Sequence, residues 1–257
     1  MCGRLAPHVL EYLAAKYRLC TSPLLEELRT VGQNVNTTPN STLPGIFQEL
    51  NGRLDWLVRP VYWQFLPEDI RNQEEAKQFS RTYSTINARQ ESLRTQRLYA
   101  EAFRQRRCII PIRGFFEWQT VEGEARKRPW WIAPTEKIVG IAAVYNMTRW
   151  KPEIPTVAVV TTHASEGKMA AIHERMPVFL TEQEAALWQE TSTPEVNLLE
   201  SFNPKPEHYF EFHSVSRVIS NARWMGTLEE LMKLPLEDAA TSKKENPPES
   251  IQGDLFS

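Results

Sequence analysis

The chain has 257 residues, of which 30 are Lys or Arg and 32 are Asp or Glu, giving a formal net charge of −2. This balance excludes nucleic-acid binding through overall charge, so any DNA contact needs a local basic patch. The three cysteines lack metal-ligand spacing and indicate a reducing compartment, no apolar run approaches the roughly 18 residues of a membrane span, and the N-terminus lacks the apolar core of a signal peptide. We therefore expect a cytoplasmic, nucleoid-associated monomer that contacts no membrane and holds no metal or cofactor.

Helical signals are scattered along the chain. Apolar spacing predicts a helix over residues 7–17, and Ser22-Pro23 predicts a capped helix that runs through Arg29. Residues 92–106 read as one long basic helix and residues 165–174 as a shorter one. Thr181 and Glu184 have capping-box spacing, and Thr193-Pro194 begins a further helix.

Strand-like runs, rich in branched and aromatic residues, lie between the helical segments. They cover residues 57–65, 108–110, 115–118, 130–132, 138–145, 156–162, 177–180 and 209–212. These runs cluster in the middle of the chain instead of alternating regularly with helices. The pattern favours an α+β fold over a doubly wound sheet.

The composition changes after Pro235. Residues 236–257 contain five acids and two lysines and show no apolar periodicity. Such a segment buries too little apolar surface to fold, so we expect one compact domain over residues 1–235 and a disordered acidic tail over 236–257.

Distinctive chemistry starts at residue 2. Methionine aminopeptidase removes Met1 when the next residue is small, which would leave Cys2 with a free α-amine. A terminal cysteine is a 1,2-aminothiol, whose amine condenses with an aldehyde to an imine and whose thiol then closes a thiazolidine ring. The alternative is a cysteine without any chemical role at this position.

Eight short motifs occur in a fixed order. They are Met-Cys-Gly-Arg at the start, Asn36-Thr-Thr-Pro39, Trp63-Gln-Phe-Leu-Pro67, Asn87-Ala-Arg-Gln-Glu-Ser92, Arg107-Cys-Ile-Ile-Pro111, Gly114-Phe-Phe-Glu-Trp118, Ile172-His-Glu-Arg-Met-Pro177 and Val215-Ser216. Together they resemble the SRAP family, the SOS-response-associated peptidase or abasic-site processing proteins. The chain departs from the family pattern at Gln64, Thr37-Thr38, Arg113, Asn146 and Ser214, and no tryptophan follows Pro67.

The resemblance implies a single domain with a barrel-like β-sheet core and peripheral helices. It also implies a sensor, or shield, of abasic sites in single-stranded DNA, in which Cys2 forms a thiazolidine crosslink. Two alternatives stay open. One is a cysteine peptidase, limited in the narrowest case to removing its own Met1. The other is a noncatalytic adaptor that associates with the replication clamp.

Given the resemblance, the crosslinking reaction needs an acid, a base and a group that holds the sugar. Glu117 is the expected base, because its neighbours Phe116 and Trp118 would raise the pKa of its carboxyl; the alternative is a buried, ion-paired glutamate. His173 is the expected acid, near the end of a helix whose dipole favours its protonated form; the alternative is a surface histidine. Asn87 would hold a sugar hydroxyl or the bonded amine.

Arginines near these residues are the expected DNA contacts. Arg4, Arg89 and Arg175 each lie two residues from a proposed catalytic residue and would grip flanking phosphates. Asn36 with Pro39, and Trp63 with Leu66, would line the site or wedge between bases. The segment 94–113 carries six arginines and one acid, which fits either a DNA-binding surface or a solvated helix face.

The chain ends Ile-Gln-Gly-Asp-Leu-Phe-Ser. This resembles the Gln-Leu-Asp-Leu-Phe peptide by which bacterial replication and repair proteins bind the sliding β-clamp. Gln252, Asp254, Leu255 and Phe256 carry the match, with Gly253 in place of the usual leucine. We expect clamp binding through this segment; the alternative is a chance match.

Overall fold

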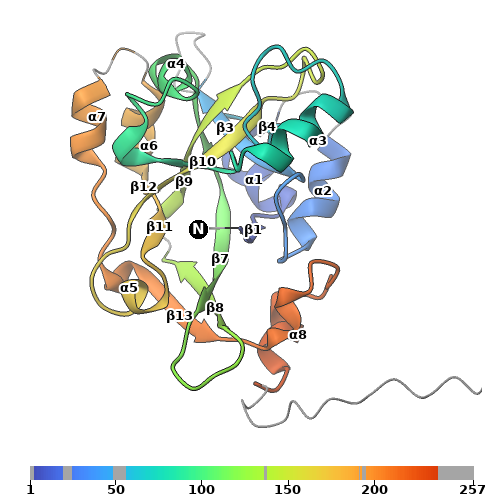
Figure 1. Cartoon of the computed structure of the whole chain (residues 1–257), viewed down its shortest axis with the longest axis vertical. Helices are drawn as coiled ribbons and strands as arrows, with labels where there is room; N and C mark the ends of the chain where they lie inside the picture. The colour runs from blue at the N-terminus through green and yellow to red at the C-terminus, as the bar shows by residue number, and fades with distance from the viewer. Residues whose placement is uncertain are drawn as a thin grey trace, which may run out of the picture.

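A computed structural model of the protein describes residues 3–19, 25–48, 56–135, 138–190, 192 and 195–236. These residues form two sheets with short helices around them (Figure 1). The smaller sheet is antiparallel, in the order β1 (Leu5–Pro7), β7 (Ile112–Gln119), β8 (Arg128–Pro134) and β13 (Phe210–Ser214). Its strand β1 begins three residues after Cys2.

The larger sheet closes on itself. In it β4 (Trp56–Trp63), β3 (Thr42–Gln48), β6 (Arg107–Ile110), β9 (Ile138–Asn146) and β10 (Thr156–His163) pair in a ring, because β10 hydrogen-bonds both β9 and β4. The remaining strands extend this ring: β2 (Arg18–Leu19), β5 (Asn87–Arg89), β11 (Arg175–Pro177) and β12 (Phe179–Thr181). The barrel-like core that the family resemblance implied is confirmed.

Helices lie at the periphery of the sheets (Figure 1). They are α1 (Leu10–Lys16), α2 (Leu25–Gln33), α3 (Gln73–Thr82), α4 (Ala100–Gln105), α5 (Lys168–Ile172), α6 (Glu182–Gln189), α7 (Glu195–Ser201) and α8 (Leu228–Lys233). Single 3₁₀ turns cover Gln90–Ser92, Glu207–Tyr209 and Arg217–Ser220. None of the helices in the described part of the chain is long and apolar enough to cross a membrane.

Two large apolar clusters hold the sheets together. The first lies between the closed sheet and the helices and includes Val58, Phe103 and Trp188. The second lies between the two sheets and includes Phe115 from β7 and Val159 from β10. Burial of these side chains is the main favourable contribution to folding.

Most predicted elements are confirmed. Each strand-like run coincides with an observed strand, although residues 177–180 divide between β11 and β12. Thr181 and Glu184 form the expected capping box in front of α6. The observed α+β architecture also agrees with the predicted fold class.

The prediction of one long helix over residues 92–106 is wrong, and the helix predicted over residues 165–174 is shorter than expected. The first segment contains a 3₁₀ turn, further turns and the six-residue α4. Leu93 and Tyr99 are both buried, yet six residues apart they would lie on different faces of one helix. A bent path buries both side chains. The second segment keeps only the five residues of α5.

Candidate active site

Strand β1 pairs with β7, and this pairing determines the position of the first residues that the structure describes. Leu5 lies opposite Phe115 and Ala6 opposite Gly114, and the Phe116 N–H donates to the Arg4 carbonyl at 3.1 Å. The same antiparallel register, continued, sets Gly3 opposite Glu117. Cys2 lies outside the described residues and is the neighbour of Gly3 in the sequence.

Gly114 lets β7 lie this close to β8. A Cβ at this position would meet the ring of Trp131 and, at 2.7 Å, the carbonyl oxygen of Ile132. The glycine of the Gly-Phe-Phe-Glu-Trp motif therefore sets the position of the strand that carries Glu117.

Glu117 is buried, with 3% of its surface exposed. Burial raises the pKa of its carboxyl to about 7, against the opposing effects of the charge at the amino terminus, a backbone hydrogen bond from Trp118 and the charge of Lys127. A carboxyl with such a pKa exchanges its proton near neutral pH, so it can act as both acid and base. The expected pKa rise for Glu117 is confirmed.

His173 caps the C-terminal end of α5. The backbone N–H of Arg175 donates to its Nδ1 at 3.0 Å, and burial lowers the pKa of the imidazole. Burial of the ring and the positive charge at the amino terminus lower this pKa, so the imidazole is less easily protonated than its place at the end of a helix predicted. Nδ1 also lies 3.2 Å from the Arg175 carbonyl. Where Nδ1 accepts from the Arg175 N–H, the proton of the neutral ring is on Nε2, which leaves an N–H donor for a ligand.

The apolar cluster between the sheets anchors the chain one or two residues before each of Glu117, His173 and Asn87. Phe115 and Ile172 belong to the cluster between the sheets, and Ile86 packs against it. The side chain of Gln119 also donates to the Ala171 carbonyl at 2.9 Å and ties β7 to α5. Asn87 lies opposite Val159, is 9% exposed, and accepts a bond from the Tyr99 hydroxyl on its carbonyl at 3.4 Å.

Arg4 binds Asn36 directly. Its Nη1 donates to Asn36 Oδ1 at 2.8 Å, and Asn36 Nδ2 donates to the carbonyls of Asn221, at 2.9 Å, and Trp224, at 3.2 Å. Only 1% of Asn36 is exposed. Asn36 was expected to line the site or wedge between bases; its burial does not fit a wedge, because its polar atoms bind Arg4 and the segment after β13.

Trp63 and Leu66 are fully buried. The Trp63 indole donates to the Ile86 carbonyl at 3.0 Å, and Leu66 packs with Ile70 and Ala76. The expectation that these two side chains wedge between bases is not met, since both side chains are packed in the core. Trp63 instead holds the residue before Asn87 in place. Pro39 is half-buried.

Arg175 and Arg89 occupy different surroundings. Arg175 is 5% exposed; its guanidinium binds Glu91 and donates to the Thr161 carbonyl at 2.6 Å. Arg89 is exposed, and no hydrogen bond or ion pair of its side chain occurs within the described part of the chain. Arg89 is therefore the better placed of the two for a phosphate, whereas Arg175 positions the residues around His173.

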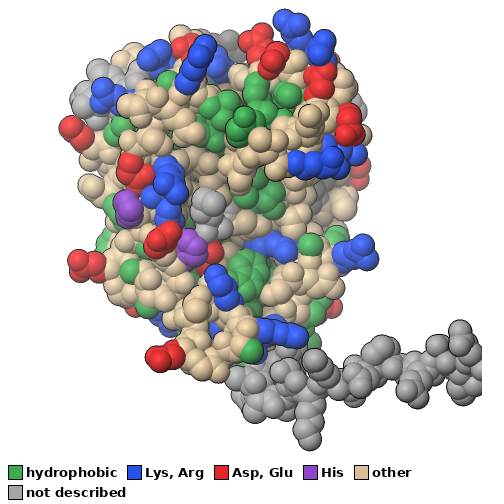
Figure 2. Space-filling model, viewed as in Figure 1, with side chains coloured by type: hydrophobic (Ala, Val, Ile, Leu, Met, Phe, Trp, Pro, Cys, Tyr) green, Lys and Arg blue, Asp and Glu red, His purple; other side chains and the backbone are tan. Residues whose placement is uncertain are grey.

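The surface around the site is mixed in charge. Figure 2 shows His, Lys and Arg side chains together with Asp and Glu in the middle of the face that carries β7. Among the described residues, no three His, Cys, Asp or Glu side chains lie close enough to hold a metal ion. Cys108 is buried, which raises the pKa of its thiol and makes it a poor nucleophile.

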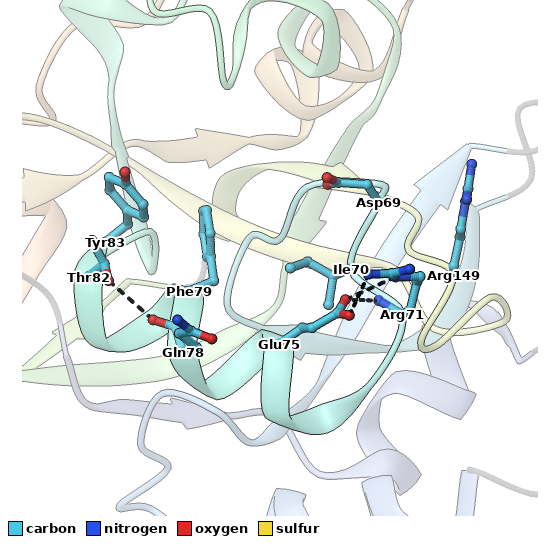
Figure 3. A pocket seen from close by; sticks show the side chains of 9 residues that line it. All are labelled: Asp69, Ile70, Arg71, Glu75, Gln78, Phe79, Thr82, Tyr83 and Arg149. Carbon is cyan, nitrogen blue, oxygen red and sulfur yellow. Dashed lines mark hydrogen bonds and ion pairs between the residues drawn. The ribbon is translucent and has the colours of Figure 1, made fainter.

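A hollow of about 620 Å³ lies on one side of α3 and has none of the predicted site residues in its lining (Figure 3). Its lining consists of Asp69, Ile70, Arg71, Glu75, Gln78, Phe79, Thr82, Tyr83 and Arg149. Arg71 is paired with Glu75 at 2.9 Å. Because the lining carries two arginines and two acids, it favours neither sign of charge.

Three supporting residues had no role in the sequence analysis. Gln119 links β7 to α5, the charge of Lys127 acts on both Glu117 and His173, and Glu91 binds Arg175. Glu91 stands within the Asn87–Ser92 motif, which was a signal of its importance. Lys127 and Gln119 carry no such signal, because their effects depend on contacts across the fold.

Comparisons with known proteins agree with this arrangement. "Abasic site processing protein HMCES" from Pongo abelii is 25% identical over 268 residues, covering 87% of this chain and 73% of the relative. "Abasic site processing protein YedK" from Escherichia coli K12 is 30% identical over 145 residues, covering 55% of this chain and 64% of the relative, less than two thirds of its length. A crystal structure of a protein from Bacteroides thetaiotaomicron shares the fold, with a TM-score of 0.69, 19% identity and coverage of 84% of this chain and 91% of that one.

The family model that matches the chain is described as "SOS response associated peptidase (SRAP)" and aligns with residues 1–222. This span includes the strand that follows Cys2 and all the residues placed around Glu117. The chain belongs to the SOS response associated peptidase (SRAP) family.

Proposed function

We propose that this protein senses abasic sites in single-stranded DNA and shields them by bonding covalently to the sugar aldehyde through Cys2. The proposal is supported by membership of the SRAP family and by relatives that are named abasic site processing proteins. It also agrees with the proton-transfer groups gathered beside the start of the chain.

The reaction conserves atoms and electrons without a cofactor. After removal of Met1, the Cys2 amine attacks C1′ of the ring-opened sugar and forms a carbinolamine. Loss of one water gives an imine, and the Cys2 Sγ–H adds across the C=N bond. The product is a thiazolidine, and the net change is the loss of one water.

Each proton transfer has a candidate group. Glu117 takes a proton from the anomeric hydroxyl during ring opening and returns one to the leaving water, since its carboxyl has a pKa of about 7. His173 in its protonated form donates its Nε2 proton to the ring oxygen and becomes neutral, the form that its lowered pKa favours. Asn87 holds the opened sugar by hydrogen bonds from its amide.

The observation that carries the proposal is the register of β1 on β7. Continued two residues beyond Leu5, this register leads Gly3, the residue after Cys2, to a buried glutamate whose pKa is shifted into the neutral range. A strand whose only task is structural has no need of a buried titratable carboxyl there, because burial of the charged form is unfavourable.

Denaturing electrophoresis with an abasic oligonucleotide tests the proposal. The wild-type protein should give a heat-stable shifted band, whose mass is that of protein plus oligonucleotide less one water. Cys2→Ala should abolish the band, and Cys2→Ser should give at most an imine that borohydride traps. A tag before Cys2 should also abolish it, because the amine becomes an amide. A stable adduct from Cys2→Ala at wild-type yield would exclude the mechanism.

A peptidase reaction is the second candidate, and the family name favours it. Cys2 would act as nucleophile with His173 or Glu117 as base, limited to removal of Met1. Such a reaction needs donors for the developing oxyanion. Intact-mass measurement distinguishes the two: a self-processing peptidase loses Met1 without aminopeptidase, whereas the crosslinker depends on that enzyme.

We further propose, from the sequence alone, that the final residues dock on a replication clamp in the cytoplasm and that the protein acts as a monomer. Gln252, Asp254, Leu255 and Phe256 lie outside the described residues. Leu255 and Phe256 would fill an apolar pocket while Gln252 forms hydrogen bonds. Clamp docking would raise the local concentration of the protein at replication forks.

A further inference from the structure

A second hollow, of about 410 Å³, lies beside α3 and differs in charge from the first. Its lining consists of Asn40, Tyr62, Gln73, Ala76, Lys77, Ser80, Arg81 and Trp150. This lining contains two cations and no carboxylate. The ammonium of Lys151 adds a third cation, 5.6 Å from the ring centre of Tyr62 and 5.0 Å from that of Trp150.

The two aromatic rings of the hollow are held in place by their backbones. Tyr62 and Trp150 lie edge to face, with ring centres 5.7 Å apart and planes at 84°. The Trp150 N–H donates to the Ile70 carbonyl at 2.9 Å, and the Tyr62 N–H donates to the Pro155 carbonyl at 2.8 Å. A ligand that stacks on these rings would therefore meet a surface that is already ordered, which reduces the entropic cost of binding.

Two cations of the hollow have no acidic partner among the residues that the structure describes. Lys77 and Arg81 are exposed and lie one turn apart on α3, and neither forms an ion pair with any residue that the structure describes. By contrast, Arg71 in the neighbouring hollow forms an ion pair with Glu75, which neutralises its charge. Aromatic faces beside unpaired cations match the two parts of a nucleotide, its base and its phosphate.

The hollow is linked to the start of the chain by a short loop. Thr37 pairs with Leu5 of β1, and Asn40 lines the hollow and accepts a hydrogen bond from the Tyr62 hydroxyl at 3.3 Å. Thr37 and Asn40 are three residues apart, so this loop spans at most about 10 Å. Through Leu5 and β7 the loop connects the hollow to the strand that carries Glu117, so a DNA strand that is bound at Glu117 and follows the loop past Pro39 would reach the hollow.

We propose that this hollow binds an unpaired nucleotide of the DNA strand that flanks the abasic site. The base stacks on Trp150 beside Tyr62, and Lys77, Arg81 and Lys151 attract the phosphates. This inference rests on the proposed function, since it takes the occupant to be part of the same single strand. Single-stranded binding sites combine stacking with a cationic groove in this way.

Oligonucleotides with a tetrahydrofuran analogue of the abasic site, which has no aldehyde, test binding without crosslinking. Lengthening the oligonucleotide on one side of the analogue should tighten binding by the wild-type protein. Trp150→Ala should lose about 5- to 150-fold in affinity for the long oligonucleotide and bind the short one as the wild type does. Trp150→Phe, which keeps a stacking ring, should retain most of the gain.

A second variant tests the cations without touching packed residues. Changing Lys77 and Arg81 together to Gln should reduce the slope of log affinity against log salt by about 1.4 for the long oligonucleotide. The matched control changes Lys16 and Lys233, two exposed lysines on α1 and α8, to Gln, and its slope should equal that of the wild type.

Two results would overturn the inference. One is equal loss of affinity by Trp150→Ala for short and long oligonucleotides, and the other is an unchanged salt slope in the Lys77 and Arg81 variant. Failure of the proposed function gives a different result, namely no crosslink between the wild-type protein and any abasic oligonucleotide. The binding comparison does not depend on that reaction.

Discussion

Arg175 binds Glu91 through two parallel hydrogen bonds, from Nη1 to Oε1 at 3.2 Å and from Nη2 to Oε2 at 3.0 Å. Glu91 follows β5, which carries Asn87, and Arg175 begins β11, two residues after His173. The pair therefore joins two sequence motifs across β10. Burial alone would raise the pKa of Glu91, but the bonds from Arg175 leave it below the ordinary value.

Glu91→Ala should lower the free energy of unfolding by about 1–3 kcal/mol, because the buried guanidinium of Arg175 loses its carboxylate acceptor and keeps only Thr161. It should also slow crosslinking by displacing the backbone N–H that binds His173 Nδ1. Thermal unfolding and timed gels measure the two effects. Glu101→Ala, which breaks the exposed pair with Arg104, is the control and should cost less than about 1 kcal/mol.

A different result is expected if Arg175 binds a phosphate, as the sequence predicted. In that case Glu91→Ala would leave the melting temperature unchanged and tighten DNA binding, since Arg175 would be released for the phosphate. That outcome would contradict the positioning role.

Local patterns predicted the strands and the capping box because those depend on neighbours in the sequence. Glu117 was also predictable, since Phe116 and Trp118 already mark its strand as apolar. The closure of the barrel was not predictable, because it depends on parallel pairing of Thr156 with Tyr62, far apart in the chain. Periodicity carries no information about such contacts.

Trp63 and Asn36 illustrate a second limit of the sequence. An aromatic ring near a functional motif suits either base stacking or a core, and only the packing around it decides. Trp63 turns inward and bonds the Ile86 carbonyl, whereas Trp150, in a segment without any motif, lines a cationic hollow. Asn36 is similar, because its partners Arg4, Asn221 and Trp224 come from both ends of the domain.

Arg89→Ala should weaken binding to single-stranded DNA and reduce the salt slope by about 0.7, the value for one lost phosphate contact. The reason is that Arg89 is exposed, stands two residues after Asn87 and has no partner among the residues described. Binding titrations at several salt concentrations measure the slope. Arg97→Ala, an exposed change in the basic segment 94–113, should leave it unchanged; an equal reduction would extend the DNA-binding surface to that segment.

Deleting residues 250–257, or changing Leu255 and Phe256 to Ala, should abolish binding to the sliding clamp. A single short peptide binds weakly, on the order of micromolar, because ordering the segment costs entropy. Calorimetry with purified clamp measures the binding, and crosslinking to a free abasic oligonucleotide should not change. No heat of binding from the intact protein at tens of micromolar would contradict clamp docking.

Glu117→Gln should slow crosslinking by roughly ten- to ten-thousand-fold, the usual range for lost acid–base catalysis, while DNA binding is preserved. The amide fills the same space but exchanges no proton. Single-turnover gels measure the rate, and affinity for the tetrahydrofuran oligonucleotide checks the binding. Glu122→Gln, an exposed change on the turn after β7, is the matched control. A wild-type rate from Glu117→Gln would make the residue structural.

Glu117 should also make the stability of the protein depend on pH. Its carboxyl has a pKa near 4.5 when unfolded and about 7 when folded, so between these values the folded state binds more protons. The stabilising contribution is therefore complete below about pH 4.5 and is lost as the pH rises through 7. Glu117→Gln lacks this loss, and the wild type should melt roughly 7–14 °C lower relative to the variant at pH 8 than at pH 4.5. Melting curves that keep a constant difference across this range would show that the folded carboxyl has an ordinary pKa.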